Sequence, residues 1–127
     1  MKIRLLVIGK TDDKNLNQLI ENYQKRLQHY IGFQLEVIHD IKNVKNLSEI
    51  QQKEKEGELI LAKLKNTDQL VLVIGGPYGF SETVYKKAMG KISLSKMTFS
   101  HQMIRLFIVE QLYRGFTILK NEPYHHE

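Results

Sequence analysis

The chain has 127 residues, a formal net charge of +5 at pH 7, 42% hydrophobic and 26% charged residues, and no cysteine. This length fits one domain, residues 1–127, with a single core. Disulfides and thiolate metal sites are excluded, and the five histidines lack metal-ligand spacing, so we expect no metal. The positive charge suits RNA or DNA, although a solvated surface has the same signature. No apolar run approaches a membrane span, and we expect a cytoplasmic protein without a membrane partner.

The hydrophobic pattern predicts strands that alternate with helices. Four short runs are apolar, as expected for strands buried on both faces, and the segments between them have helical periodicity. The predicted strands are residues 3–8, 33–38, 70–74 and 92–94, and the predicted helices are about residues 13–30, 48–64, 82–89 and 101–119. This alternation predicts an α/β domain, with a mostly parallel sheet and helices on both faces.

Two of the helices have predicted inner faces. Apolar residues recur at three- and four-residue steps in the first helix, and three point inward in the second. The inward positions are Leu16, Leu19, Ile20, Tyr23 and Leu27 in the first helix and Leu59, Ile60 and Leu64 in the second. The charge run at residues 53–56 is interpreted as a solvated helix face.

The last helix, residues 101–119, is apolar around most of its circumference. A helix of this kind needs burial on all sides, and one small sheet covers only one side. We therefore predict a homodimer through this helix. The alternative is a central helix that its own chain surrounds.

Two segments could bind a small ligand through the backbone. Gly75 and Gly76 follow a predicted strand and precede a helix, where glycine permits close approach of a ligand. Residues 93–100 form a polar loop before the last helix, which Thr98 or Ser100 can cap. The alternatives are a plain tight turn and a capping loop. The glycine pattern is neither a dinucleotide fingerprint nor a P-loop.

Polar residues on the last helix and in the tail could carry chemistry. His101, Arg105 and Arg114 interrupt the apolar pattern, although Arg114 lies four residues after Glu110 and could simply form an ion pair. At the chain end, an aromatic and an imidazole group could stack on a base and move a proton. A frayed tail is the alternative.

Several motifs together resemble one family. They are Met1-Lys2-Ile3 with Gly9-Lys10, residues 23–27, residues 53–57, Ile74-Gly75-Gly76-Pro77-Tyr78-Gly79, residues 94–99, residues 101–105, residues 110–114 and Pro123-Tyr124-His125. In this order they cover nearly the whole chain. The chain resembles the ribosomal RNA large-subunit methyltransferase H family, within the SPOUT superfamily of α/β-knot methyltransferases.

The resemblance implies a homodimer that uses S-adenosylmethionine to methylate N3 of a pseudouridine in 23S rRNA of the assembled ribosome, with no DNA partner. The implied cofactor-binding residues are Gly75, Gly76, Ser95, Lys96, Met97, Thr98, Phe99 and Ser100, and the implied catalytic residues are Tyr124, His125 and Arg114. The tail would complete a site across the dimer. His125 or Tyr124 could act as the base, and an arginine could stabilise the uridinate.

One departure from the family concerns the third strand. In the family, a loop and a helix separate a strand like residues 70–72 from the strand that ends in Gly75 and Gly76. Here Leu72 runs directly into Val73, and no parallel crossover fits between them. The two strands are therefore interpreted as one, and the knot and one wall of the cofactor pocket are in question. Two rival interpretations are an inactive RNA- or ribosome-binding module of the same fold and an unrelated Rossmann-like dimer.

Overall fold

The computed structural model describes residues 2–41, 44–64, 70–76, 78–93 and 99–124. In chain order the elements are β1 (Lys2–Ile8), α1 (Lys14–Leu27), β2 (Gly32–Ile38), the 3-10 turn η1 (Val44–Asn46), α2 (Glu49–Lys63), β3 (Leu70–Ile74), α3 (Glu82–Lys87) and α4 (His101–Leu119). The predicted alternation of strands and helices is confirmed through β3. The predicted polar loop after β2 contains η1.

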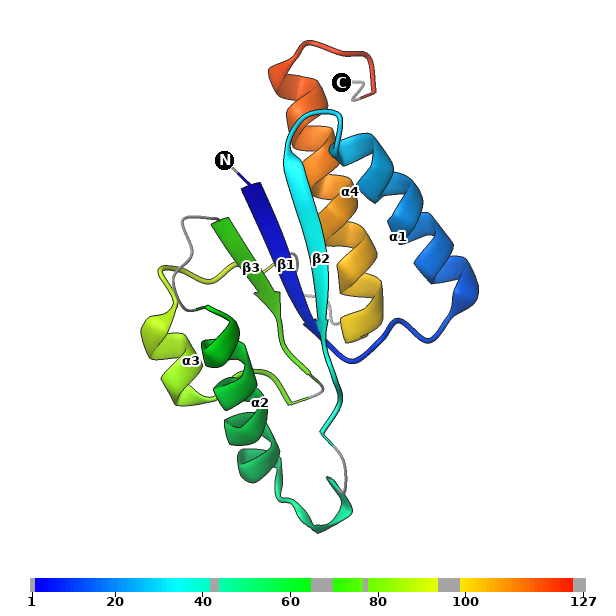
Figure 1. Ribbon diagram of the computed structural model, residues 1–127. Helices are drawn as coiled ribbons and strands as arrows, with labels where there is room; N and C mark the ends of the chain where they lie inside the picture. Colours follow the sequence, from blue (N-terminus) through cyan, green and yellow to red (C-terminus); the bar gives the residue numbers. More distant parts are fainter. Residues whose placement is uncertain (1, 42–43, 65–69, 77, 94–98, 125–127) are drawn as a thin grey trace.

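The three strands form one parallel sheet in the order β2-β1-β3. β1 is central: its Leu5 pairs with Leu35 of β2 on one side and with Leu72 of β3 on the other. Helices α1 and α4 cover one face of this sheet, and α2 and α3 lie on the other (Figure 1). The predicted α/β architecture is therefore confirmed.

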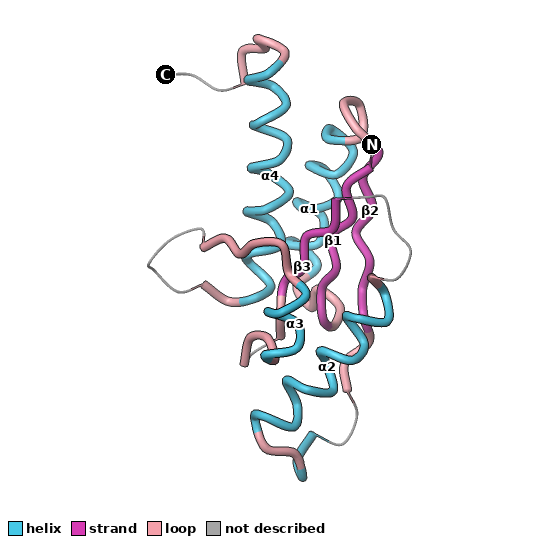
Figure 2. The backbone as a smooth tube through the Cα atoms, turned by 90° about the vertical axis from the view of Figure 1, so that its left-hand side faces the viewer, coloured by secondary structure: helices cyan, strands magenta, loops and turns pink. Residues whose placement is uncertain are grey.

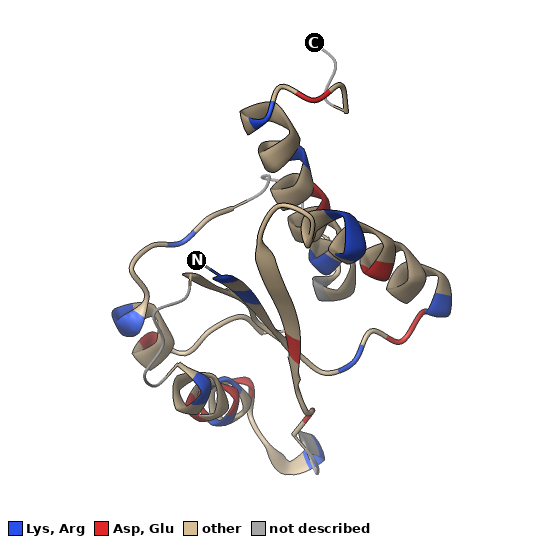
Figure 3. Cartoon of the chain, turned by 45° about the horizontal axis from the view of Figure 1, so that its top comes forward, with Lys and Arg blue, Asp and Glu red and all other residues tan. Residues whose placement is uncertain are grey.

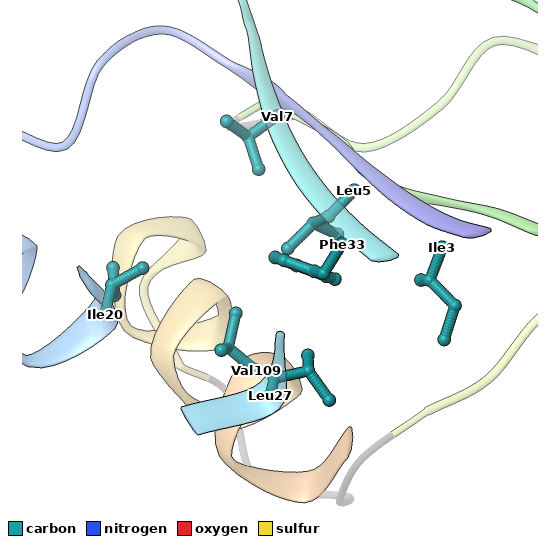
Figure 4. Packing of buried hydrophobic residues seen from close by; sticks show 7 residues of the cluster. All are labelled: Ile3, Leu5, Val7, Ile20, Leu27, Phe33 and Val109. Carbon is teal, nitrogen blue, oxygen red and sulfur yellow. The ribbon is translucent and has the colours of Figure 1, made fainter. Parts of the chain in front are cut away.

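Alternate side chains of β1 supply the core on both faces of the sheet. Leu5 and Val7 point toward α1 and α4, and Leu6 and Ile8 toward α2 and α3. The cluster under α1 and α4, shown in Figure 4, consists of Ile3, Leu5, Val7, Ile20, Leu27, Phe33 and Val109. Full burial of one such aliphatic side chain stabilises the fold by about 1.5–3 kcal/mol.

Side-chain caps fix where the helices begin. The Asp13 carboxylate accepts from the backbone N–H groups of the first turn of α1, and Ser48 forms a capping box with Gln51 at α2. The Ser100 hydroxyl accepts from the backbone N–H of Met103, so it begins α4. Ser100 is one of the two caps that the sequence predicted for this helix.

The structure corrects several local predictions. A strand at residues 92–94 is wrong for the two positions described: Ile92 and Ser93 have no secondary structure, and Ile92 is 82% exposed. The described sheet ends at β3, and a strand this short gains little without a neighbour to pair with. Leu19 and Leu59 are exposed rather than inward, because each lies beside the buried stripe of its helix.

The two ends of α4 lie at opposite edges of the sheet. Because the strands are parallel, Ile8, Ile38 and Ile74 end at one carboxyl edge. α4 begins at that edge and runs back toward the amino edge, where its last turns pack against the segment before β2 (Figures 1 and 2). This placement decides which candidate residues can meet within one chain.

Candidate active site

Gly75 and Gly76 form a tight turn directly after β3, at the carboxyl edge of the sheet. The Gly79 N–H donates to the Gly76 carbonyl at 3.1 Å, and Gly79 has φ +81°, a conformation that glycine tolerates best. A Cβ on Gly75 would lie 3.1 Å from the ring of Phe80. The turn therefore leaves no room for side chains along its inner surface.

A carboxyl group lies against this turn. Glu56 of α2 is 4% exposed, and a Cβ on Gly76 would lie 2.7 Å from both of its oxygens. Gln52, one turn earlier, donates to Glu56 Oε2 at 3.3 Å. The interpretation of residues 53–56 as wholly solvated is therefore wrong at Glu56. Four-residue spacing from Ile60, which is buried on the same face of α2, is the sequence signal that could have revealed it.

The second predicted cofactor segment leads into α4 at this same edge. Ser95, Lys96, Met97 and Thr98 lie outside the described residues. Phe99 and Ser100 are described: the Phe99 ring packs edge-on against Phe107 at 5.2 Å between centroids. The structure thus brings the end of this loop and the glycine turn to one edge of the sheet.

An anchor of two side chains, Arg105 and Gln102, fixes the start of α4 at this edge. Arg105 is 1% exposed, and its Nη2 donates to the Ile8 carbonyl at 2.7 Å while Nη1 donates to Thr11 Oγ1 at 3.0 Å. Gln102 Nε2 donates to Asp12 Oδ2 at 2.8 Å, and the Asp12 N–H donates back to Gln102 Oε1 at 2.9 Å. The first turns of α4 are therefore held on the end of the central strand.

Burial of this guanidinium has an electrostatic cost. Desolvation lowers the pKa of Arg105, and the charges of Asp40 and Asp12 oppose that shift. Arg105 Nε is buried with no hydrogen-bond partner among the described residues. In the sequence, Arg105 stands out only as a polar interruption of the apolar pattern. Its four-residue spacing from buried Val109 marks it as facing the sheet.

The predicted catalytic residues Tyr124 and Arg114 come together at the other end of α4. Arg114 Nη2 lies 2.7 Å from Glu110 Oε1, which is the ion pair that the sequence offered as the simple explanation. The Arg114 guanidinium also lies 5.5 Å from the centre of the Tyr124 ring. The Tyr124 hydroxyl is 3.1 Å from that of Tyr23. The tail is thus packed on its own chain as far as Tyr124, and His125 lies outside the described residues.

The tail residue Tyr124 belongs to an aromatic cluster between the C-terminal ends of α1 and α4. Its ring centroid is 4.7 Å from that of Tyr113, which in turn is 5.9 Å from Tyr23. The members of this aromatic cluster are Tyr23, Tyr30, Tyr113, Phe116 and Tyr124.

The surroundings of Tyr124 keep its hydroxyl protonated at neutral pH. Burial, the hydrogen bond with Tyr23 and the charge of Glu110 together raise the pKa of Tyr124 to about 12, against a smaller opposing effect of Arg114. A phenol of this kind is suited to donating a hydrogen bond and is a poor general base at pH 7.

Within one chain the two groups of candidate residues are far apart. Fourteen helical steps separate Ser100 from Arg114, which at 1.5 Å per residue is roughly 20 Å. The glycine turn lies with Ser100 at the carboxyl edge, whereas Tyr124 lies with Arg114 toward the amino edge (Figure 1). The described residues of one protomer therefore do not form a single site.

The other features of the described residues do not form a second candidate active site. A cavity of about 320 Å³ lies at the amino edge of the sheet, away from the glycine turn; its lining residues are Lys2, Ile3, Gln28, Gly32, Phe33 and Gln34. Among the described residues, no group of three or more His, Cys, Asp or Glu side chains is placed to hold a metal ion. No helix in the described part of the chain has both the length and the apolarity needed to cross a membrane.

Sequence comparison places these features in a family. A family model described as "Predicted SPOUT methyltransferase" matches residues 1–72 and 64–125. The chain is 61% identical to a protein of Flavobacterium johnsoniae and 57% identical to one of Parabacteroides distasonis, each over 157 aligned positions that cover all of both chains. A protein of Christiangramia forsetii is 56% identical over 99% of both chains. All three are named "Ribosomal RNA large subunit methyltransferase H".

The comparisons also bear on the departure that the sequence indicated near Leu72. The alignment has 157 positions and this chain has 127 residues, so at least 30 aligned positions have no residue here. The two matches to the family model overlap at residues 64–72, so this stretch, which includes the start of β3, corresponds to two places in the family. With that internal difference, the chain belongs to the SPOUT methyltransferases, as a member of the ribosomal RNA large subunit methyltransferase H family.

Proposed function

We propose that this protein uses S-adenosylmethionine to methylate N3 of a pseudouridine in 23S rRNA of the assembled ribosome, acting in the cytoplasm as a homodimer. The observation that carries the proposal is the arrangement of α4, with a glycine turn and loop end at its start and a tyrosine–arginine pair at its finish. The family and the names of its relatives supply the substrate class.

The glycine turn and the loop before α4 are suited to holding the cofactor through backbone groups. Gly75 and Gly76 carry no side chains of their own, although Phe80 and Glu56 pack against them. The anchor of Arg105 and Gln102 fixes the first turns of α4. When bound, S-adenosylmethionine supplies an electrophilic methyl group on a sulfonium. The Glu56 carboxyl group beside the turn suits a cationic ligand.

The other end of α4 is suited to holding the uracil ring. Tyr124 keeps its proton at neutral pH, so it orients the base by donating a hydrogen bond rather than by removing the N3 proton. His125 is then the proposed base, since an imidazole titrates near neutral pH. Arg114 is a cation beside Tyr124, and in this proposal it stabilises the uridinate that forms when N3 loses its proton.

A homodimer resolves the separation within one chain. If two copies pair along antiparallel α4 helices, the start of one helix lies beside the end of the other. Much of α4 is left for such a contact, because only Arg105, Val109 and Thr117 of its described side chains are fully buried. Each active site would then combine one protomer's glycine turn with its partner's tail.

Calorimetric titration with S-adenosylmethionine tests the cofactor assignment. We expect micromolar binding, followed by methyl transfer from labelled cofactor to intact ribosomes that lack the modification. Light scattering should give the mass of two chains, and a stable monomer at micromolar concentration would reject the dimer.

A mixing experiment tests whether the site is shared. One variant carries Gly76→Asp, which blocks the turn, and the other carries Tyr124→Ala, which removes the ring from the tail. Each is expected to be inactive alone. Mixed dimers contain one site with both an intact turn and an intact tail, so activity should return on mixing. No recovery after subunit exchange would contradict a shared site.

The missing positions at β3 favour a second candidate, an inactive RNA- or ribosome-binding module of the same fold. A unit of about 30 residues is the size of a strand–helix crossover, and its loss beside the glycine turn could remove part of a cofactor pocket. Ribosome binding without cofactor binding would support this candidate over the enzyme.

A further inference from the structure

The aromatic cluster carries a cation that the proposed chemistry does not use. Arg26, in the last turn of α1, places its guanidinium carbon 5.2 Å from the centre of the Tyr23 ring and 5.8 Å from that of Tyr113. The two rings are half-buried, whereas Arg26 is exposed. The guanidinium is thus held over two rings and still faces solvent.

Arg26 differs from the other arginine of this region in its charge partners. Arg114 forms an ion pair with Glu110, which offsets much of its charge. Arg26 has no carboxylate within 4 Å among the residues that the structure describes. Lys25 and Lys120 are exposed at the ends of the same two helices, and basic residues of α1 and α4 are visible there in Figure 3. Glu122, which accepts a hydrogen bond from Tyr30, adds one carboxylate at this end, so the three cations Arg26, Lys25 and Lys120 leave a net positive charge.

A cation held on aromatic rings is typical of surfaces that bind single-stranded nucleic acid. Such surfaces pair a positive group for the phosphates with aromatic groups beside the bases. Rings that fix a guanidinium in place also reduce the rotamer entropy that it loses on binding. An acidic protein segment would need the charge but not the rings, so RNA is the better fit.

We propose that Arg26, supported by Tyr23 and Tyr113, binds a backbone phosphate of the RNA strand that flanks the target nucleotide. Tyr124 contacts both supporting residues: its hydroxyl lies 3.1 Å from the Tyr23 hydroxyl, and its ring packs against the Tyr113 ring. A strand bound at Arg26 therefore leads directly to the tail. The assignment of this strand as substrate rests on the proposed function. The binding itself does not require methyl transfer, so it can be tested separately.

The test compares Arg26→Gln with Lys14→Gln. Lys14 is exposed at the opposite end of α1, so its replacement removes the same charge from the same helix without touching the rings. Binding of a fluorescein-labelled single-stranded RNA of mixed sequence is followed by anisotropy between 50 and 200 mM KCl. We expect Arg26→Gln to weaken binding about tenfold and to reduce the slope of log K against log salt by about 0.7, the value for one phosphate contact on a single strand. Lys14→Gln should change the dissociation constant less than about twofold.

Two further variants separate the phosphate contact from a structural role. Arg26→Lys should restore the salt slope, because the charge returns. Tyr23→Leu should weaken binding while leaving the slope unchanged, because only the support of the guanidinium is lost. An Arg26→Gln variant that binds like Lys14→Gln, or that loses affinity with an unchanged slope, overturns the proposal. Equal binding of a polyglutamate peptide with the same dependence on Arg26 also overturns it.

Calorimetry with S-adenosylmethionine on Arg26→Gln keeps this proposal distinct from the proposed function. Cofactor affinity should match that of the unaltered protein. If the unaltered protein binds RNA through Arg26 and does not bind the cofactor, the enzymatic proposal fails and the RNA surface stands. If the unaltered protein binds the cofactor and Arg26→Gln does not change RNA binding, the RNA surface fails and the enzymatic proposal stands.

Discussion

The two ends of α4 are held in different ways. At the start of the helix, the almost completely buried Arg105 donates to the last carbonyl of β1 and to Thr11. Gln102 forms hydrogen bonds with Asp12, in the segment after β1. At the C-terminal end of α4, the Arg114 guanidinium lies over the partly exposed Tyr124 ring, and Arg114 also forms an i,i+4 ion pair with Glu110.

This difference suits the two tasks that we propose for the helix. Buried hydrogen bonds with few alternatives fix a geometry, which a cofactor site needs so that the methyl group is aligned with its acceptor. Partly exposed contacts are individually weak and easily exchanged, which suits a tail that has to accommodate an RNA base. Breaking each end separately should therefore produce different defects.

The largest effect is expected for Arg105→Met. The variant leaves the Ile8 carbonyl without its buried donor and removes the donor to Thr11, so we expect the free energy of unfolding in urea to fall by about 3 kcal/mol. Because only the Gln102–Asp12 hydrogen bonds then remain of the anchor at the start of α4, affinity for S-adenosylmethionine should fall about tenfold.

Val109→Ala is the matched control for this anchor. Val109 is buried on the same face of α4, and truncation should cost about 2 kcal/mol through the cavity that it leaves. Its cofactor affinity should stay within about twofold of the unaltered protein. If both variants lose affinity in proportion to stability, Arg105 has only a structural role.

Much of the fold followed from the sequence because its signals are local. Continuous apolar runs marked β1 and β3, and the side chains of Ser48 and Ser100 marked the starts of α2 and α4. Each depends on residues within one turn or strand, so a single sequence suffices. The strand predicted at residues 92–94 failed because a strand depends on a neighbour that the local sequence does not specify.

The candidate site was less accessible to sequence analysis because it depends on contacts between distant elements. Glu56 lies 20 residues before Gly76, and nothing in the charge run shows that the two touch. The buried Arg105 guanidinium donates to the Ile8 carbonyl, which lies 97 residues earlier in the chain. Sequence motifs identified the glycine turn, Arg114 and Tyr124 as candidates. Only the fold shows that roughly 20 Å along α4 separates the turn from Arg114 and Tyr124.

A smaller effect is expected for Gly76→Ala. The added Cβ would lie 2.7 Å from the Glu56 oxygens, so the buried Glu56 carboxyl group or the turn has to shift, which should cost about 1–2 kcal/mol of stability. Cofactor affinity should fall about tenfold if the turn binds it. Gly90→Ala is the control, since a Cβ there meets nothing within 4 Å.

Combining Gly76→Ala with Glu56→Ala tests whether Gly76→Ala acts through the clash with Glu56 or by altering the backbone of the turn itself. Shortening Glu56 removes the clash, so the double variant should regain part of the stability lost by Gly76→Ala, a coupling that a double-mutant cycle measures. Additive losses would show that the carboxyl group is not what requires glycine at this position.

The smallest effect on the fold is expected from the tail, and it depends on pH. The folded state raises the pKa of Tyr124 from 10 to about 12, so it favours the protonated phenol. The stabilisation from that phenol is fully present below pH 10 and is lost as pH rises through about 12. Tyr124→Phe should therefore remove one transition near pH 12 from the ultraviolet titration of the tyrosines. Tyr30→Phe, whose own pKa is raised to about 12 mainly by the hydrogen bond to Glu122, should remove a different one.

The same pKa predicts how Tyr124 affects methyl transfer. Because the phenol stays protonated between pH 6 and 9, Tyr124→Phe should lower the rate on ribosomes by a constant factor across this range and leave the shape of the pH profile unchanged. The profile should instead follow an imidazole, and His125→Gln should abolish its acidic limb. A profile whose shape changes in Tyr124→Phe would make the phenol itself the group that takes the N3 proton, and would show that docking of the substrate lowers the pKa that the free protein raises.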